Sequence, residues 1–202
     1  MANTNIANGF TPVMMADGKP YYGIGKKYYK DSAVANMVIA VGDPVIRVTA
    51  SSDPLGGPSI TRATTGSEVT GIVVGIEPVR TNLAQVGYLG TGDSGYVYVE
   101  DDPYVIYEVQ EGNSTGAAGT PLTIANAVGQ CINSCTAVAG NTTIGRSKYN
   151  IDNSALGTST YTWIIKGLVQ RSDNAVGSYA KWLVQANKST EINAAAANIE
   201  QI

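Results

Sequence analysis

The sequence predicts an all-β protein, either a sandwich or a barrel of many short strands. The first observation is that β-branched and aromatic residues gather in short runs, several of which alternate with polar residues as half-buried strands do. The second is turn punctuation, because 23 glycines and 8 prolines divide these runs at short intervals. A chain of 202 residues is long enough to bury a sizeable core in such a fold.

The N-terminal region divides into a polar arm and a segment rich in tyrosine and lysine. Residues 1–18 contain Asn, Thr and Ala with one aromatic residue, Phe10, and we expect a flexible arm that only a partner orders. Residues 19–30 alternate paired tyrosines with lysines, so this segment is basic within an acidic protein. It is either a pair of strands with solvated lysines or a contact surface for an acidic protein or a nucleic acid.

Two apolar stretches follow. Val38, Ile39 and Val41 precede the turn signal Gly42-Asp43-Pro44, and three further apolar residues, ending at Val48, follow it, which predicts strand, turn and strand. Residues 69–76 are almost continuously apolar and stop at Glu77-Pro78, which is typical of a strand buried on both faces.

Residues 95–110 are predicted to form the central hairpin. Val97 and Val99 share one face of the first strand, and Val105, Tyr107 and Val109 share one face of the second. Three residues that favour turns lie between the strands, namely Asp101, Asp102 and Pro103. We therefore expect the chain to reverse at this acidic turn.

The remaining strands are predicted at residues 161–169 and at residues 179–184, which carry Trp182. Residues 121–138 have no clean period and are compatible with a short helix. In residues 189–202, Ile192, Ile199 and Ile202 recur at roughly helical spacing among alanines, which predicts a short C-terminal helix or a docking tail.

Composition favours contacts with other proteins. Charged residues make up only 14% of the chain and the net charge is −3, so there is no general basic field to attract nucleic acid. No apolar run approaches the ~20 residues of a membrane helix. The polar start lacks the apolar stretch of a secretory signal, so we expect synthesis in a cytoplasm-like compartment.

Motifs that could carry chemistry each lack a required feature. The segment Gly90-Thr-Gly92-Asp-Ser-Gly95 matches a dinucleotide-binding pattern, but a strand-forming run follows it where a helix is needed. The same segment contains Gly-Asp-Ser-Gly, the loop of a serine nucleophile, yet the chain has no histidine to act as its base. We expect no catalysis.

Metal and redox sites are not expected either. Glu100, Asp101 and Asp102 could supply oxygen ligands to calcium, but consecutive side chains of a strand alternate between faces. Cys131 and Cys135 are spaced wrongly for a C-x-x-C site and are expected to be reduced, buried thiols. No cofactor or metal is predicted.

Short sequence segments along nearly the whole chain resemble the cement, or decoration, proteins of tailed-bacteriophage capsids. They are the Asn/Thr/Gly-Phe start at residues 3–12, Gly42-Asp43-Pro44-Val45, Gly71-Ile-Val-Val-Gly-Ile-Glu-Pro78, and residues 99–110, 140–145, 167–171 and 180–184. The resemblance implies an antiparallel, jelly-roll-like β-sandwich that binds the outside of the capsid and bridges neighbouring major capsid protein subunits. The protein would then be made in the host cytoplasm and reside in the virion.

We therefore expect a flexible arm at residues 1–18, one sandwich domain at residues 19–188 and a tail at residues 189–202. The expected partners are the major capsid protein and further copies of the chain, as a dimer or trimer, with no nucleic acid and no membrane. The predicted contact residues are Phe10, Tyr21, Tyr22, Lys26, Lys27, Tyr28 and Tyr29. The alternatives are a lectin-like or receptor-binding module of a virion, and a carboxylate-based glycosidase.

Overall fold

A computed structural model describes residues 3–35, 37–49, 53–79, 83, 85–135, 139–157 and 160–191. Nearly all of its regular structure is β, which confirms the predicted fold class. The elements are β1 (Thr11–Met15), β2 (Lys26–Lys30), β3 (Ile39–Ala40), β4 (Pro44–Val48), β5 (Ser59–Arg62), β6 (Gly71–Ile76), β7 (Tyr88–Leu89), β8 (Gly95–Glu100), β9 (Val105–Gly112), α1 (Ile124–Ala127), β10 (Cys131–Ser134), β11 (Ile151–Gly157), β12 (Trp163–Leu168) and β13 (Lys181–Ala186).

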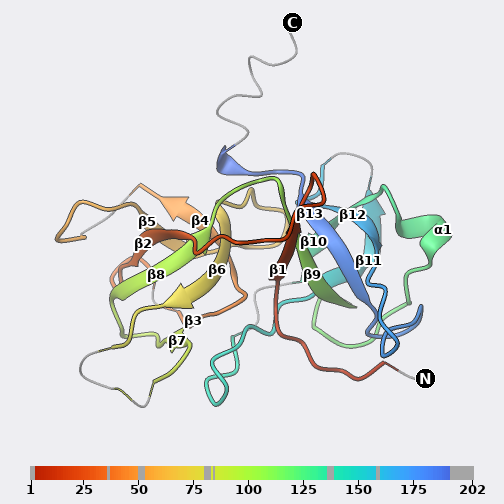
Figure 1. Ribbon diagram of the computed structural model, residues 1–202. Coiled ribbons are helices and arrows are strands. Elements are labelled where there is room, and N and C mark those ends of the chain that lie inside the picture. The colour runs from red at the N-terminus through yellow and green to blue at the C-terminus, as the bar shows by residue number, and fades with distance from the viewer. Residues whose placement is uncertain are drawn as a thin grey trace, which may run out of the picture.

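The strands form two small barrels that lie side by side (Figure 1). The first barrel is the closed ring β2-β5-β4-β6-β8. In the second barrel the order is β9-β11-β10-β12-β13, and pairing of β13 with β9 closes the ring. β1 adds to the outside of this ring along β9, and a ribbon of β3 and β7 lies below the first barrel (Figure 1).

This arrangement differs from the expected antiparallel sandwich. Two pairings are parallel, β2 with β5 and β11 with β9. Register shifts interrupt β6 between Val73 and Gly75 and β12 between Ile165 and Gly167. Such bulges increase local twist, and a strongly twisted small sheet can close on itself, which leaves fewer exposed edges than a sandwich.

The predicted hairpin at residues 95–110 is wrong. β8 pairs with β2 and β6 in the first barrel, whereas β9 pairs with β1, β11 and β13 in the second. Residues 101–104 therefore cross from one barrel to the other instead of reversing the chain. The predicted faces are nevertheless correct, because Val97 and Val99 are buried in the first barrel and Tyr107 and Val109 in the second.

The strand–turn–strand prediction around Gly42-Asp43-Pro44 is correct, although the two strands do not pair with each other. β3 and β4 flank the turn, but β3 pairs with β7 and β4 with β5 and β6. The reversal is fixed by the buried Asp43, whose Oδ2 accepts a hydrogen bond from the Ala40 amide at 2.9 Å. A hydrogen bond from nearby backbone to an Asp side chain is expected in a turn of this kind. The strands with which β3 and β4 pair are instead determined by the tertiary structure.

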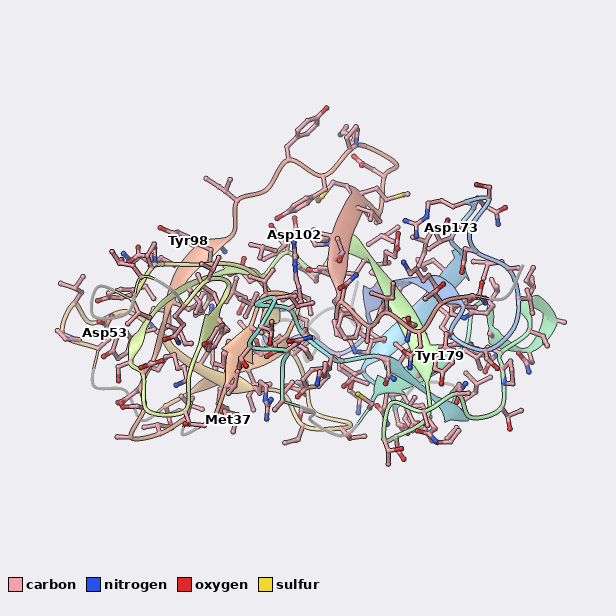
Figure 2. All side chains as sticks on the ribbon, turned by 90° about the horizontal axis from the view of Figure 1, so that it is seen from below. Met37, Asp53, Tyr98, Asp102, Asp173 and Tyr179 are labelled. Carbon is pink, nitrogen blue, oxygen red and sulfur yellow. The ribbon has the colours of Figure 1, made fainter. Side chains whose placement is uncertain are left out.

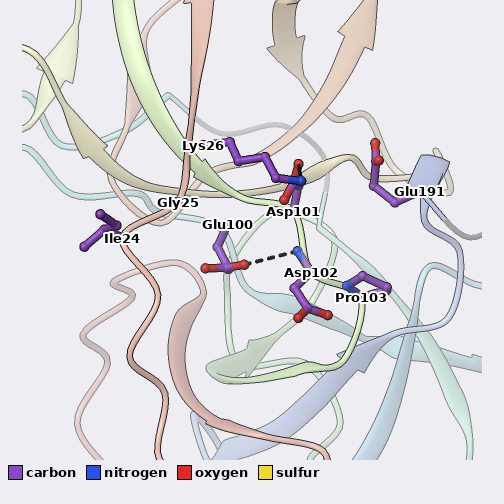
Figure 3. A pocket seen from close by; sticks show the side chains of 8 residues that line it. All are labelled: Ile24, Gly25, Lys26, Glu100, Asp101, Asp102, Pro103 and Glu191. Carbon is purple, nitrogen blue, oxygen red and sulfur yellow. Dashed lines mark hydrogen bonds and ion pairs between the residues drawn. The ribbon is translucent and has the colours of Figure 1, made fainter.

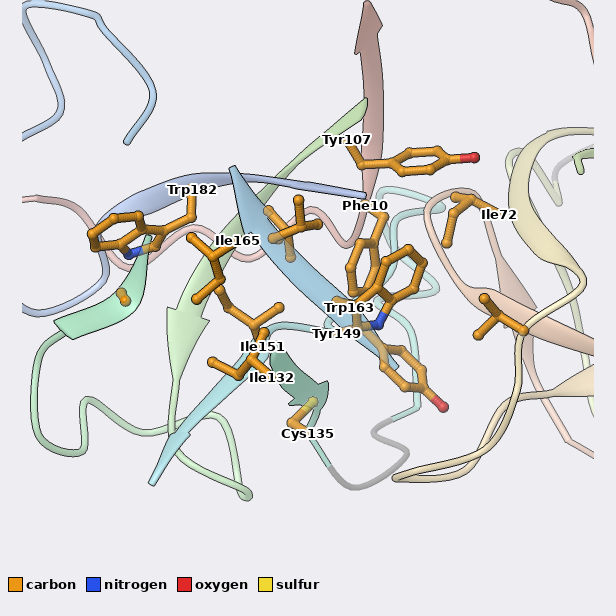
Figure 4. Close-up of a cluster of buried hydrophobic side chains, with 14 of the residues drawn as sticks. Phe10, Ile72, Tyr107, Ile132, Cys135, Tyr149, Ile151, Trp163, Ile165 and Trp182 are labelled. Atoms are coloured by element: carbon orange, nitrogen blue, oxygen red, sulfur yellow. The ribbon is translucent and has the colours of Figure 1, made fainter. Parts of the chain in front are cut away.

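Two apolar clusters form the core. The smaller cluster fills the first barrel and includes Tyr28, Val97 and Val99. The larger cluster fills the second barrel and continues through Ile72 into the first, so it also joins the barrels. Phe10 lies at this joint, where its ring stacks on Trp163 with centroids 4.4 Å apart (Figure 4).

The expected flexible arm is wrong for its second half. Phe10 is only 1% exposed, and its amide donates to the Gly42 carbonyl at 3.0 Å. β1 then adds Thr11–Met15 to the sheet along β9. One large aromatic side chain, buried against Trp163, is sufficient to attach a segment that its other residues would leave free.

The tail can be followed only to its beginning. Ser189 is buried and forms a parallel bridge with Val69, which ties the start of the tail to the residues just before β6. The isoleucine-spaced residues 192–202, on which a helix was predicted, lie outside the described residues. The short helix expected within residues 121–138 is the single turn α1, after which β10 begins.

Candidate functional site

The most distinctive surface lies at the junction of the barrels, where two crossing segments meet. Residues 16–25 lead from β1 to β2, and residues 101–104 lead from β8 to β9. Asp102 lies between the barrels, with Tyr98 on one side and Asp173 on the other (Figure 2). The first segment runs from the second barrel to the first, and the other runs back from the first barrel to the second. Because the two segments are far apart in the sequence, they form a common surface only in the folded protein.

The first crossing segment alternates between anchored and exposed residues. The Tyr21 hydroxyl donates to Glu100 Oε2 at 2.6 Å, and Gly23 passes so close to this carboxylate that a Cβ atom would overlap it. Tyr22 and Ile24 point the other way and are 85% and 86% exposed. The extended backbone places successive side chains on opposite sides, so anchoring Tyr21 displays Tyr22 to solvent.

Two grooves flank this segment. The acidic groove has a volume of about 500 Å³ and is lined by Ile24, Gly25, Lys26, Glu100, Asp101, Asp102, Pro103 and Glu191 (Figure 3). The apolar groove has a volume of about 380 Å³ and is lined by Met15, Lys19, Pro20, Tyr21, Tyr22, Gly23, Glu100, Asp102 and Val105. Glu100 and Asp102 belong to both, so the two grooves meet at these carboxylates.

The acidic residues are unequally neutralised. Asp101 Oδ2 receives hydrogen bonds from Lys26 Nζ at 2.9 Å and from the Tyr28 hydroxyl at 2.8 Å. This contact with Asp101 raises the pKa of Lys26, since the carboxylate favours the ammonium form. Glu100 accepts from Tyr21 and from the Asp102 amide, at 2.6 Å and 3.1 Å. Within the described part of the chain, neither Glu100 nor Asp102 pairs with a cation.

Opposite Lys26, the acidic groove is bounded by Glu191. This carboxylate pairs with Arg47, with 2.9 Å between Nη2 and Oε1. Arg47 also donates to the Tyr28 hydroxyl at 2.9 Å, and this bond raises the pKa of the guanidinium. Burial is the main cause that raises the pKa of Tyr28 to about 12. The hydroxyl therefore stays protonated and links Arg47 to Asp101.

The structure separates the predicted contact residues into three groups. Phe10 and Tyr28 are buried in the core, so they are wrong as surface contacts. Tyr21 is half-buried against Glu100, and Tyr29 packs on Tyr96 with ring centroids 5.2 Å apart. Tyr22 is exposed at the junction.

The lysines of residues 19–30 do not form the expected free basic patch. Three of them pair with carboxylates: Lys19 with Asp17 at 2.6 Å, Lys26 with Asp101 at 2.9 Å and Lys27 with Glu77 at 2.6 Å. Lys30 is fully buried, and its ammonium donates to the Gly90 and Asp93 carbonyls at 2.8 Å and 2.6 Å. Attraction of an acidic partner by these lysines is therefore much weaker than their number suggests.

Lys30 also explains the glycine-rich motif at residues 90–95. The loop curls around the lysine, and Asp93 Oδ2 closes it by accepting from the Gly90 amide at 2.7 Å. Carbonyl oxygens point to the centre of the loop, whereas a phosphate site presents amides. The motif is thus a structural loop that encloses a buried ammonium.

Sequence reasoning missed three residues of the junction. Ile24 lies within the tyrosine–lysine segment, but a single apolar residue between Gly23 and Gly25 has no pattern that predicts its exposure. Tyr104, which is 62% exposed, lies between the predicted turn and the second predicted strand, where no local signal marks it as a contact residue. Glu191 reaches the groove from the start of the tail, and no local signal connects it with Glu100.

Comparisons with protein-family models, with curated proteins and with solved structures found no match to this chain. Among the described residues, no three acidic, cysteine or histidine side chains converge as metal ligands. In the same part of the chain, no helix has the length and apolar character to cross a membrane. Cys131 and Cys135 are buried thiols, and burial raises the pKa of each.

Proposed function

We propose that the protein is a non-enzymatic structural component of a tailed-bacteriophage virion. It binds the outside of the capsid and bridges neighbouring major capsid protein subunits. The identity of this partner rests on the sequence resemblance, and the place of the contact rests on the geometry of the junction. The protein is made in the host cytoplasm and resides on the capsid surface.

One observation carries the choice of contact surface: two exposed tyrosines, one on each crossing segment, lie at the junction. Tyr22, which lines the apolar groove of about 380 Å³, is 85% exposed, and Tyr104, the neighbour in sequence of the lining residue Val105, is 62% exposed. Tyrosine provides a large contact area at small entropic cost and is common among the residues that dominate binding energy. An exposed pair of this kind is typical of a protein contact site.

The chemistry of the junction supports a binding role over a catalytic one. The chain has no histidine, and the glycine-rich loop is filled by Lys30. Two carboxylates at the junction are held by phenol groups, Glu100 by Tyr21 and Asp101 by Tyr28. Such fixed hydrogen bonds hold these side chains in place and give the surface a defined shape, as a contact site requires.

The test measures binding to undecorated capsid shells by cosedimentation. Tyr22→Ala combined with Tyr104→Ala should weaken binding by at least about tenfold, as expected for contact residues that contribute more than about 1.4 kcal/mol. The matched control combines Leu55→Ala with Val176→Ala, two residues that are also exposed but lie away from the junction. The control should bind like the parent.

One outcome would refute the proposed function, and another would refute the proposed contact surface. If the parent protein does not bind shells, the resemblance is misleading. Selective binding of the parent on a glycan array would then favour the lectin-like module. If the parent binds but the tyrosine variant binds equally well, the junction is not the contact surface. Thermal unfolding of each variant shows whether a loss of binding reflects a loss of fold.

A further inference from the structure

The described residues include a basic turn that complements the acidic groove. We define the basic turn as residues 141–148. Its two ends are joined by reciprocal backbone hydrogen bonds between Asn141 and Arg146, at 2.7 Å and 3.2 Å. Ile144 lies within it and is 56% exposed. The turn is therefore preformed and carries an apolar side chain at its surface.

The charge of the basic turn is not neutralised. Arg146 and Lys148 are exposed, and neither forms an ion pair within the described ranges. Residues 141–148 contain no Asp or Glu. The turn thus presents one apolar side chain, Ile144, followed along the chain by two exposed cations.

The acidic groove has the opposite pattern. Ile24 is 86% exposed at its border, and Glu100 and Asp102 line it without a cationic partner in the described part of the chain. Its other two carboxylates are already paired, as described above. The groove therefore presents one exposed isoleucine beside the half-buried Asp102, with the largely buried Glu100 behind it, to two exposed cations and one exposed isoleucine.

The two surfaces cannot meet within one molecule. The acidic groove includes Pro103 and lies beside the start of β9, whereas Ile144 and Lys148 border Thr115 and Gly116, beyond its end. A strand of this length spans about 25 Å at ~3.3 Å per residue. In Figure 1 the loop of residues 141–146 projects at the lower edge, far from the crossing segment of residues 16–25.

We propose that the basic turn of one copy docks in the acidic groove of a second copy of this chain. Ile144 would pack on Ile24, and Arg146 and Lys148 would approach Glu100 and Asp102. This contact joins two different surfaces, so it is a head-to-tail contact, which gives a closed ring or an open filament according to the rotation between copies. The contact overlaps the apolar groove at Glu100 and Asp102, which line both grooves, and Tyr22 lines only the apolar groove.

The experiment follows self-association by sedimentation velocity without capsid shells, so its outcome is independent of the proposed function. The parent should form larger species as its concentration rises over about a hundredfold range, and added salt should weaken this association. The turn variant combines Arg146→Ser with Lys148→Ser, and the groove variant is Asp102→Lys. Each should need at least about tenfold more protein to associate. The control Lys166→Ser removes an exposed cation elsewhere and should behave like the parent.

Mixing the two variants distinguishes a head-to-tail contact from a symmetric one. The turn variant keeps an intact groove and the groove variant keeps an intact turn, so their mixture should form heterodimers and stop there. A parent that is monomeric at every concentration would overturn the proposal and leave both surfaces to other proteins. A mixture that stays monomeric, or variants that associate as well as the parent, would overturn it equally.

Discussion

Glu111 provides the sharpest test of the fold of the second barrel. This carboxyl is fully buried at the end of β9, and its Oε2 atom accepts from the Trp182 indole at 2.9 Å and from the Leu122 amide at 3.1 Å. The side-chain amide of Asn153 also contacts Glu111, so all three of these neighbouring groups are neutral. Burial raises the pKa of Glu111 from 4.5 to about 7, and these hydrogen bonds offset only part of that effect.

The sign of the pH dependence follows from this shift. Between pH 4.5 and about 7 the folded protein keeps a proton that the unfolded chain has released. The contribution of Glu111 to the free energy of unfolding therefore falls as pH rises through this window and is constant above it. Because one pKa unit corresponds to about 1.4 kcal/mol, the ionised carboxylate costs the folded state about 3 kcal/mol at pH 8.

Glu111→Gln removes this cost and should raise the free energy of unfolding at pH 8 by up to about 3 kcal/mol. Its amide oxygen can accept the bonds from Trp182 and Leu122. Its NH₂ group can face Asn153 Oδ1, which has no hydrogen-bond partner among the described residues, as is also true of Glu111 Oε1. At pH 4 the two proteins should be almost equally stable.

The assay is urea unfolding of parent and variant in parallel from pH 4 to pH 9. The result is the difference between their free energies of unfolding at each pH. Taking the difference cancels other buried groups, such as Asp43, whose pKa burial raises to about 6. A difference that does not change with pH would refute the reasoning. A variant less stable than the parent at pH 8 would also refute it, because it would mean that a cation holds the ionised Glu111.

Three further substitutions test the packing and the buried charge. Phe10→Ala should lower the free energy of unfolding by about 3–5 kcal/mol in urea titrations, because it opens a cavity against Trp163; a loss below about 1 kcal/mol would show that the segment before β1 is not anchored there. Val99→Asp should abolish cooperative thermal unfolding, since it buries an unpaired charge in the first barrel, and an unchanged melting temperature would contradict the assigned face. Lys30→Met should lower stability by roughly 1–3 kcal/mol, because it leaves the Gly90 and Asp93 carbonyls without their donor; equal stability in the same titration would show that water replaces the ammonium.

Local patterns were sufficient for the strongly apolar strands, such as β6, β8, β9 and β12, but not for β1, which lies in the predicted arm, or for β10 and β11, which lie in segments where no strand was predicted. The alternation in residues 95–110 correctly predicted that Val97 and Val99 point into one core and Tyr107 and Val109 into another, because side-chain direction in a strand repeats every two residues. The same pattern correctly predicted the β class. It contained no information about which strands pair, since every strand in the chain offers the same backbone donors and acceptors.

In the candidate site, too, some features follow from local sequence and others only from the tertiary structure. The sequence could predict only that Tyr21 and Tyr22 point to opposite sides, and the distant Glu100 decides that Tyr21 is the anchored one and Tyr22 the exposed one. The burial of Phe10 and Tyr28 likewise depends on partners elsewhere in the chain, Trp163 for Phe10 and Asp101 and Arg47 for Tyr28. A lone aromatic residue in a polar arm looks the same whether it is buried or free.

Charge was the property on which sequence and structure differed most. The sequence determined that residues 19–30 carry four lysines, and it excluded a histidine-based active site. Only the tertiary structure decided that Lys26 and Lys27 are neutralised, because Asp101 and Glu77 reach them from other strands and crossing segments. Ion pairing acts over a few ångströms, whereas these partners lie at least fifty residues away in sequence, so the free charge of a surface is set when the barrels close.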